Sequence, residues 1–78
     1  MKVTIKPVAA LRKFLPPGVT DQVEVELPEG ATAADAAAAL GIPAGHAGAA
    51  FLDNRKADLD TPLAEGQVVA LIPPLGGG

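Results

Sequence analysis

The sequence predicts one α+β domain, in which short strands and a single main helix share a small core. Three observations carry this prediction. Residues 2–6 and 22–27 alternate polar and apolar side chains, as a strand does when one of its faces is buried. Residues 32–40 are rich in alanine, which favours a helix, and residues 67–72 form an apolar segment with β-branched side chains. At 78 residues, the chain is long enough for one core.

The N-terminal third predicts two strands separated by a short turn of helix. In the first strand, residues 2–6, Val3 and Ile5 are expected to point inward. Residues 8–15 carry apolar side chains at helical spacing and run into a Pro-Pro-Gly sequence, which predicts a short helix or turn that stops there. The second strand is expected at residues 22–27.

The main helix has recognisable start and stop signals. Thr32 can cap its N-terminus, and Asp35 follows at the spacing of a capping box, with Asp in place of the usual Glu or Gln. Six alanines lie between positions 33 and 39 and favour the helix. Gly41 is expected to end it in a left-handed conformation. Leu40 is expected to be the main contact of the helix with the core.

The C-terminal half predicts three more strands. Two are expected at residues 49–52 and 57–59, joined by a turn at 53–56. Leu63 is expected to be buried under the turn before the last strand. Because residues 67–72 are apolar on both faces, the last strand is predicted to lie in the centre of the sheet.

Composition argues against several kinds of partner. The formal charge of −3 disfavours nucleic acid, whose phosphates a mildly acidic surface repels, and would suit a partner with a basic groove. No apolar stretch approaches the roughly 18 residues of a membrane span, and the N-terminus does not resemble a signal peptide. We therefore expect a cytoplasmic protein, monomeric when free, with no membrane or nucleic-acid partner.

The chain lacks the side chains from which active sites are usually built. It contains no Cys, Ser, Tyr or Trp, and its one histidine, His46, lies among small residues without a second histidine or a carboxylate cluster nearby. We interpret His46 as a solvated loop residue. The order of Asp53, Asp58 and Asp60 is not that of a calcium loop. We predict no metal site and no enzymatic activity of the chain itself.

The C-terminus is the most distinctive part of the sequence. Pro73 and Pro74 cannot donate hydrogen bonds to a sheet, so strand pairing is expected to end there. Leu75 offers a hydrophobic contact. We divide the chain into a domain, residues 1–75, and a flexible tail, residues 76–78, whose glycines could pass a narrow channel to a catalyst. Taken alone, three terminal glycines favour a frayed end or a cloning remnant, but these follow directly from a strand and two prolines.

The order of elements, the segments LPEGATAADAAAALGI and DTPLAEGQVVALIPP and the terminal Gly77-Gly78 together resemble the MoaD/ThiS family of ubiquitin-like sulfur carriers. The resemblance covers essentially the whole chain. The double proline favours the MoaD-like branch over ThiS. The chain departs from the family pattern at Gly76, where a side chain often precedes Gly-Gly, and at residues 53–55, which replace a common Asn-Gly turn.

The resemblance implies a β-grasp fold: a mixed sheet of four to five strands, with the first strand parallel to the last and one main helix across it. It also implies that the reactive group is the C-terminal carboxylate of Gly78. An ATP-dependent activating enzyme would adenylate this carboxylate, and sulfur would then convert it to a thiocarboxylate. ATP and Mg²⁺ would be used by that partner, and this chain would bind no cofactor. We expect the partners to contact five residues: Pro74, Leu75, Gly76, Gly77 and, at the edge of the apolar surface, Arg12.

The leading hypothesis is a sulfur carrier for molybdenum cofactor biosynthesis, acting as the non-catalytic small subunit of molybdopterin synthase. Its partners would be the activating enzyme and the large subunit of the synthase. Three alternatives stay open: a sulfur carrier for thiamine, tRNA thiolation or cysteine synthesis; a protein modifier joined through Gly78 to lysines; and an interaction module with an inert tail.

Overall fold

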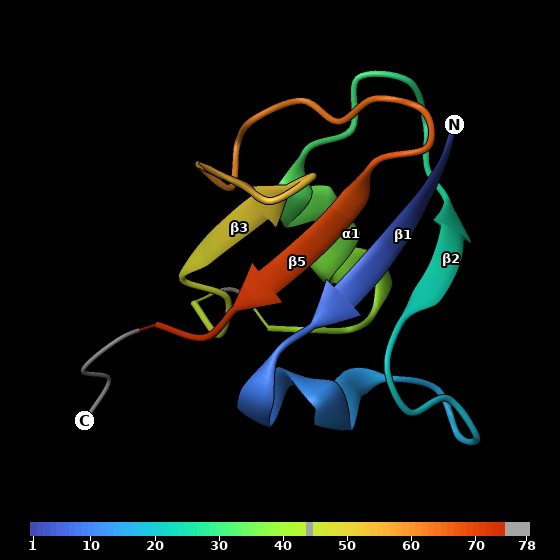
Figure 1. The fold of residues 1–78 in the computed structure, drawn as a ribbon, viewed down its shortest axis with the longest axis vertical. Coiled ribbons are helices and arrows are strands. Elements are labelled where there is room, and N and C mark those ends of the chain that lie inside the picture. The colour runs from blue at the N-terminus through green and yellow to red at the C-terminus, as the bar shows by residue number, and fades with distance from the viewer. Residues whose placement is uncertain (44, 75–78) are drawn as a thin grey trace.

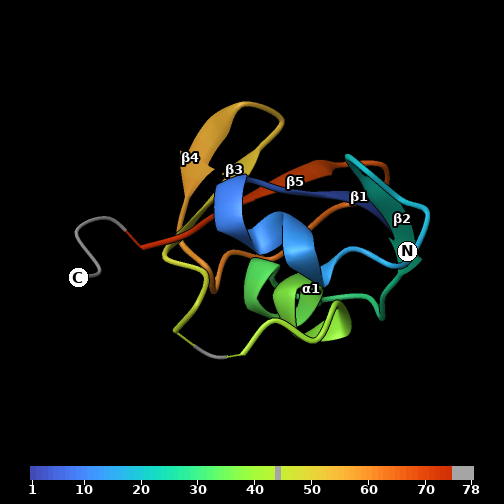
Figure 2. The same ribbon diagram turned by 90° about the horizontal axis from the view of Figure 1, so that it is seen from below.

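The computed structural model describes residues 1–43 and 45–74, which form one mixed five-stranded sheet with a helix packed across one face (Figure 1; Figure 2). The elements in chain order are β1 (Lys2–Pro7), a 3₁₀ helix η1 (Ala9–Phe14), β2 (Val23–Glu26), α1 (Ala33–Ala39), β3 (Ala49–Leu52), β4 (Arg55–Ala57) and β5 (Val68–Ile72). The prediction of one α+β unit is confirmed.

The strand order across the sheet is β2-β1-β5-β3-β4. β5 pairs in parallel with β1 and antiparallel with β3, and β2 and β4 extend the sheet outward as antiparallel partners of β1 and β3. The expected central position of the last strand and its parallel pairing with the first are therefore confirmed. Because β5 is paired along both edges, the chain that follows it starts from a fixed point.

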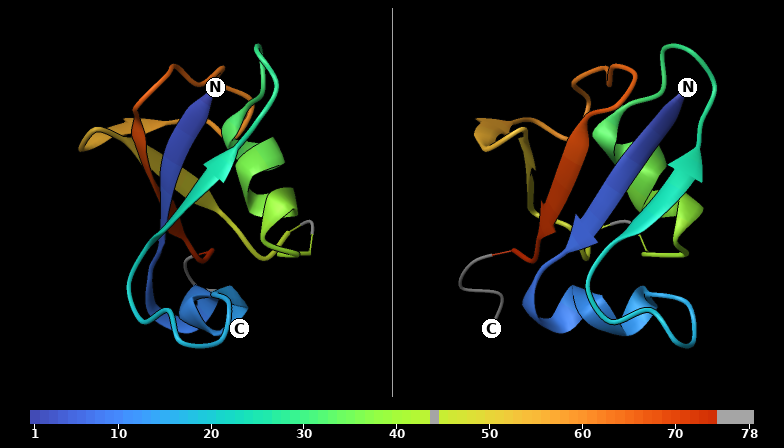
Figure 3. Two further views of the ribbon diagram at one scale, coloured as in Figure 1. Left: turned by 90° about the vertical axis from the view of Figure 1, so that its right-hand side faces the viewer. Right: turned by 45° about the vertical axis from the view of Figure 1, so that its right-hand side comes forward.

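The core lies between α1 and one face of the sheet (Figure 3). Its largest fully buried side chains come from the two central strands: Val3, Ile5, Val69 and Leu71. The expected inward direction of Val3 and Ile5 and the burial of Leu63 are confirmed.

Alanines hold α1 against the sheet. Ala33 and Ala36 are fully buried and Ala37 is buried, whereas Leu40 is only partly buried. The prediction that Leu40 anchors the helix is thus wrong. Leu40 is the C-cap residue and lies past the last turn of the helix, while the small alanines let the helix backbone come close to the strands.

The signals at the ends of α1 act as predicted. The Thr32 hydroxyl accepts a hydrogen bond from the Asp35 amide at 3.3 Å, and the Asp35 carboxylate accepts one from the Thr32 amide at 2.8 Å. These two bonds complete the capping box. Gly41 has a φ of +79°, the left-handed conformation expected after the helix.

The hairpin formed by β3 and β4 differs from the prediction. β4 spans Arg55–Ala57 and not residues 57–59, because the connecting turn contains two residues instead of four. Asp53 and Asn54 form this turn with φ angles of +50° and +71°. Two successive positive φ angles are typical of a type I′ turn, which Asp and Asn tolerate better than most residues.

Candidate functional site

The candidate site is the end of the sheet at which β5 stops. Because β1 runs parallel to β5, the 3₁₀ helix η1 that follows β1 lies at this same end (Figure 1; Figure 3). Because β3 runs antiparallel to β5, the loop before β3 lies there too. Two segments far from β5 in the sequence, η1 and the loop before β3, therefore lie beside the end of β5.

Strand pairing ends where the prolines begin, as predicted. β5 ends at Ile72, whose carbonyl accepts a hydrogen bond from the Gly48 amide at 2.7 Å. Pro73, which follows, is half-buried, and Pro74 is exposed. We call these two residues the proline ridge. The other predicted tail residues, Leu75, Gly76, Gly77 and Gly78, lie outside the described residues, and their roles stay predictions.

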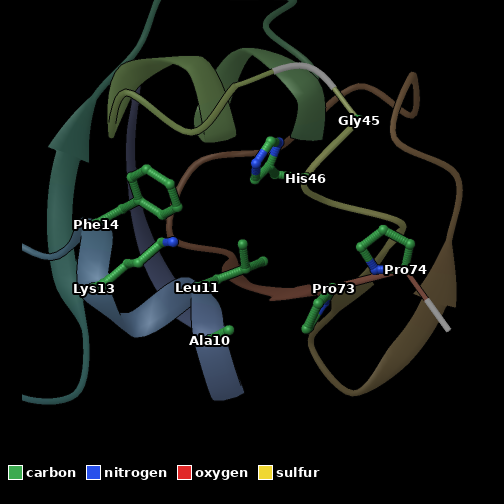
Figure 4. A pocket seen from close by; sticks show the side chains of 8 residues that line it. All are labelled: Ala10, Leu11, Lys13, Phe14, Gly45, His46, Pro73 and Pro74. Atoms are coloured by element: carbon green, nitrogen blue, oxygen red, sulfur yellow. The ribbon is translucent and has the colours of Figure 1, made fainter. Parts of the chain in front are cut away.

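A first hollow lies on one side of the proline ridge, with a volume of about 490 Å³. Figure 4 shows residues of η1 facing His46 and the two prolines across it. The Phe14 and His46 rings meet edge to face with their centroids 6.5 Å apart. The Lys13 ammonium lies 5.4 Å from the centre of the Phe14 ring, close enough for a cation–π interaction. The first hollow is thus largely apolar, with Lys13 among its lining residues.

A second hollow, of about 400 Å³, lies on the other side of the same prolines. Its lining is mostly apolar and includes Gly48, Phe51 and Ile72, with Lys56 at one side. The proline ridge therefore stands between two apolar hollows, and each hollow has one lysine among its lining residues.

The second hollow continues onto the outer face of the sheet, opposite α1. Val68 on this face is 39% exposed, and Ala70 and Ile72 are half-buried. The apolar residues on both faces of the last strand predicted its central position in the sheet. Its inner face and both of its edges are covered, by α1 and by the neighbouring strands, whereas its outer face carries the exposed Val68. The outer side chains of β5 thus form part of an apolar surface.

Two lysines border this apolar surface. Ala70 is paired with Lys6 on one side and Phe51 on the other, and Phe51 is paired with Lys56. These pairings place the four side chains in one row across four strands. Lys6 and Lys56 are exposed, and no ion pair to either is found among residues 1–43 and 45–74.

Arg12 lies in η1 at this end of the molecule but is not among the lining residues of either hollow. Its guanidinium pairs with the Asp21 carboxylate at 3.8 Å, and both side chains are 57% exposed. The neighbouring Lys13 lines the first hollow in its place. Lys13, Phe14 and Lys56 were not identified from the sequence. The alternation of β4 could have indicated Lys56 only if the two-residue turn before it had been recognised.

His46 is the one histidine of the chain, and it lies at the first hollow. His46 is exposed, as expected, and its ring contacts Phe14. Within the described ranges, no three His, Cys, Asp or Glu side chains are placed to hold a metal ion. None of the helices in these ranges has the length and apolar character needed to cross a membrane. The described residues at this end of the sheet thus offer two apolar hollows beside the proline ridge, each with one lysine among its lining residues.

Comparisons with known proteins agree on the fold. The sequence model of the ThiS family matches residues 8–78. SAMP1 from Haloferax volcanii is 26% identical over all of both chains, with a TM-score of 0.71. A putative molybdopterin converting factor, subunit 1, from Pyrococcus furiosus is 30% identical over 95% of this chain and 98% of its own, with a TM-score of 0.68.

A more distant structure, the complex of subunits 1 and 2 of the molybdopterin-converting factor from Helicobacter pylori, is 23% identical over all of both chains, with a TM-score of 0.60. At this identity it bears on the fold alone. No curated protein matches the chain. The mixed sheet with one helix across it is the ubiquitin-like β-grasp fold of these proteins, which confirms the predicted fold.

Proposed function

The chain belongs to the ThiS family, within the MoaD/ThiS group of ubiquitin-like sulfur carriers, and from this premise we propose that it carries sulfur as a thiocarboxylate on Gly78. The observation that carries the proposal is the position of β5. This strand is fixed at the centre of the sheet and ends at the proline ridge, and the sequence continues from there to Gly77 and Gly78.

The proposed chemistry takes place at the terminal carboxyl group. An α-carboxyl group has an ordinary pKa of about 3.3–3.7, so at neutral pH it is an anion and a poor electrophile. A carboxylate oxygen of Gly78 attacks the α-phosphorus of ATP, and pyrophosphate leaves. Hydrosulfide, supplied by the partner, then attacks the carbonyl carbon, AMP leaves, and loss of one proton gives the thiocarboxylate. ATP and Mg²⁺ belong to the activating enzyme.

In this proposal the domain presents the tail and docks the partner. The two hollows beside the proline ridge and the apolar outer face of β5 offer the partner a continuous surface, with Phe51 and Ile72 near its centre. Glycine residues at the tail let the partner's active site close around the chain without side-chain clashes. Ordering the tail costs conformational entropy, which contacts at this surface would offset.

We further propose that the sulfur serves molybdopterin synthesis, with the large subunit of molybdopterin synthase as the acceptor. The Pro-Pro pair before the terminal glycines and the 30% identity to the Pyrococcus furiosus protein support this pathway. The acceptor would bind the same end of the domain as the activating enzyme, so the two partners would bind one after the other.

Intact-mass spectrometry of the protein purified from its native host tests the proposal. A fraction of molecules in which one terminal oxygen is replaced by sulfur is expected, and its complete absence would count against the carrier role. The variant that lacks Gly77 and Gly78 is expected to fold normally and to lose all pyrophosphate exchange with the activating enzyme. Full exchange by this variant would show that the tail is not the reactive element.

A protein modifier is the second candidate, favoured by the similarity to small archaeal modifier protein 1 of Haloferax volcanii. In this reaction a lysine amine of the target attacks the activated Gly78 carbonyl, AMP leaves, and an isopeptide bond forms. An immunoblot of host extract with a ladder of covalent adducts would support it. Adducts that persist when sulfur delivery is blocked, with no thiocarboxylate detected, would favour the modifier over the carrier.

A further inference from the structure

Gly48 differs from the other described glycines in what an added side chain would meet. The other five have positive φ angles, and nothing lies within 4 Å of a Cβ atom built on them. Gly48 has no positive φ, but its Cβ would lie 2.6 Å from the Cα atom and 2.9 Å from the nitrogen of Pro74. Glycine at this position therefore permits a close approach of two backbone segments.

The segment around Gly48 is held in place by a hydrogen bond and by buried neighbours, whereas Pro74 is less constrained. The Gly48 amide donates to the Ile72 carbonyl at 2.7 Å, one residue before β3 begins. On either side of it, Ala47 and Ala50 are buried in the core. Pro74 is exposed and follows the last residue of β5 by two positions. A methyl group on Gly48 would therefore displace Pro74 and leave the start of β3 in place.

We propose that Gly48 is a positioning residue for the C-terminal tail, because its missing side chain sets where Pro74 lies and hence the direction in which the chain continues. The inference rests on the proposed function, in which that chain carries the reactive carboxyl group. Proline fixes its own φ near −65° and restricts the residue before it. A shift at Pro74 is therefore passed on to the tail and is not absorbed by rotation within the proline ridge.

The size of the displacement is enough to affect a reaction. Ordinary van der Waals contact with a Cβ atom begins at 3.4 Å, against the 2.6 Å between the added Cβ and the Pro74 Cα. Misplacing reacting groups by about 1 Å can lower a rate by about 10²-fold. Pro74 also lines both hollows, so its movement changes the surface that the partner meets. We expect Gly48→Ala to lower kcat/KM for activation by about 10- to 100-fold.

The test measures ATP–pyrophosphate exchange catalysed by the activating enzyme. This enzyme is isolated from the native host as the protein fraction whose exchange activity depends on added wild-type chain. Gly48→Ala, Pro74→Gly and the double variant are compared. Because Gly at position 74 can rotate away from the new methyl group, Gly48→Ala should lower kcat/KM much less in the Pro74→Gly background than in the wild type. An equal loss in both backgrounds, or no loss in either, would overturn the proposal.

Gly41→Ala is the matched control. It makes the same change at a left-handed position where the added Cβ meets no atom, so it should lower the unfolding temperature and leave kcat/KM of the folded protein unchanged. Gly48→Ala should leave the unfolding temperature unchanged and lower kcat/KM. Loss of the fold in Gly48→Ala would overturn the proposal, because the glycine would then serve the sheet and not the tail.

NMR spectroscopy tests the geometry without an enzyme. The wild type should show a nuclear Overhauser effect between the Gly48 and Pro74 protons. In Gly48→Ala, chemical shifts should change at Pro74 and beyond, with α1 unaffected. Unchanged Pro74 shifts would overturn the positioning role by themselves. A wild-type chain that gives neither exchange nor a thiocarboxylate would refute the proposed function instead, so the two failures are distinguishable.

Discussion

At the scale of single residues, the N-terminal ammonium group of Met1 is the titratable group among residues 1–43 and 45–74 whose pKa is clearly shifted. It lies 3.1 Å from the Glu26 carboxylate and 3.8 Å from that of Glu29, and it donates a hydrogen bond to the Leu27 carbonyl at 2.7 Å. The hydrogen bond with Glu26 raises the pKa of the amine above its ordinary value of 8.0, and burial opposes this shift only in part. Folding therefore favours the charged form of the amine.

This shift predicts a pH-dependent stability that Glu26→Gln removes. The stabilisation is complete at pH values below 8.0 and is lost as the pH rises through the raised pKa of the folded state. The free energies of unfolding that urea titration gives for the wild type and for Glu26→Gln should differ at neutral pH and become equal in alkaline solution. Glu24→Gln, on the same strand and the same face, is the control. Its difference from the wild type in free energy of unfolding should not change between neutral and alkaline pH. If the wild type and Glu26→Gln differed by the same free energy of unfolding at every pH, the assignment of the pH dependence to the Met1 amine would be contradicted.

At the scale of the elements, α1 depends on its N-terminal cap more than a longer helix would. It has seven residues, and its buried contacts come from alanines, which bury little apolar area each. A helix of two turns is marginal without tertiary contacts, so a bond that satisfies its first amides has a large share in its stability.

We expect Thr32→Ala to lower the free energy of unfolding by about 1 kcal/mol, the usual cost of losing an N-cap side chain. Chemical denaturation measures this change. Thr20→Ala is the control, since Thr20 is exposed and lies outside every helix and strand. Because the proline ridge and its hollows do not involve the cap, pyrophosphate exchange by folded Thr32→Ala should equal that of the wild type. Equal stability of the two threonine variants would contradict the role of the cap.

At the scale of the whole molecule, charge is distributed unevenly along the long axis of the sheet. Basic side chains gather toward the end where β5 stops, at Lys6, Arg12, Lys13 and Lys56, and Asp21 pairs with Arg12 there. Carboxylates gather at the opposite end around the N-terminal amine, at Glu26, Glu29 and Glu65. The net charge of −3 alone suits a partner with a basic groove, but the distribution favours carboxylates on the partner beside the tail.

The double variant Lys6→Glu/Lys56→Glu is therefore expected to raise KM for the activating enzyme by about tenfold, and added salt should weaken the wild-type interaction. Lys2→Glu/Arg55→Glu is the matched control. It changes the same two strands by the same charge at residues outside the row of Lys6, Ala70, Phe51 and Lys56. Its KM should stay within about twofold of the wild type. Equal effects of the two double variants would refute a directional charge contact.

The sequence by itself determined the features that depend on neighbouring residues. Thr32 and Asp35 form the predicted cap, alternation places Val3 and Ile5 inward, and the last strand ends before Pro73. Each of these follows from backbone geometry over a few residues, which spacing alone encodes. The β-grasp topology was predicted from the family resemblance, because hydrophobic periodicity within the sequence carries no information about strand order.

Only the tertiary structure decided which surfaces are left open and which distant segments meet. Val68 is half-exposed because one helix covers one face of the sheet, and no local pattern in β5 records that the other face is bare. Gly48 and Pro74 are 26 positions apart in the sequence and come into contact because β3 and β5 pair side by side. Contacts of this kind depend on strand pairing between remote residues, and so the constraint on the tail became visible only in the folded chain.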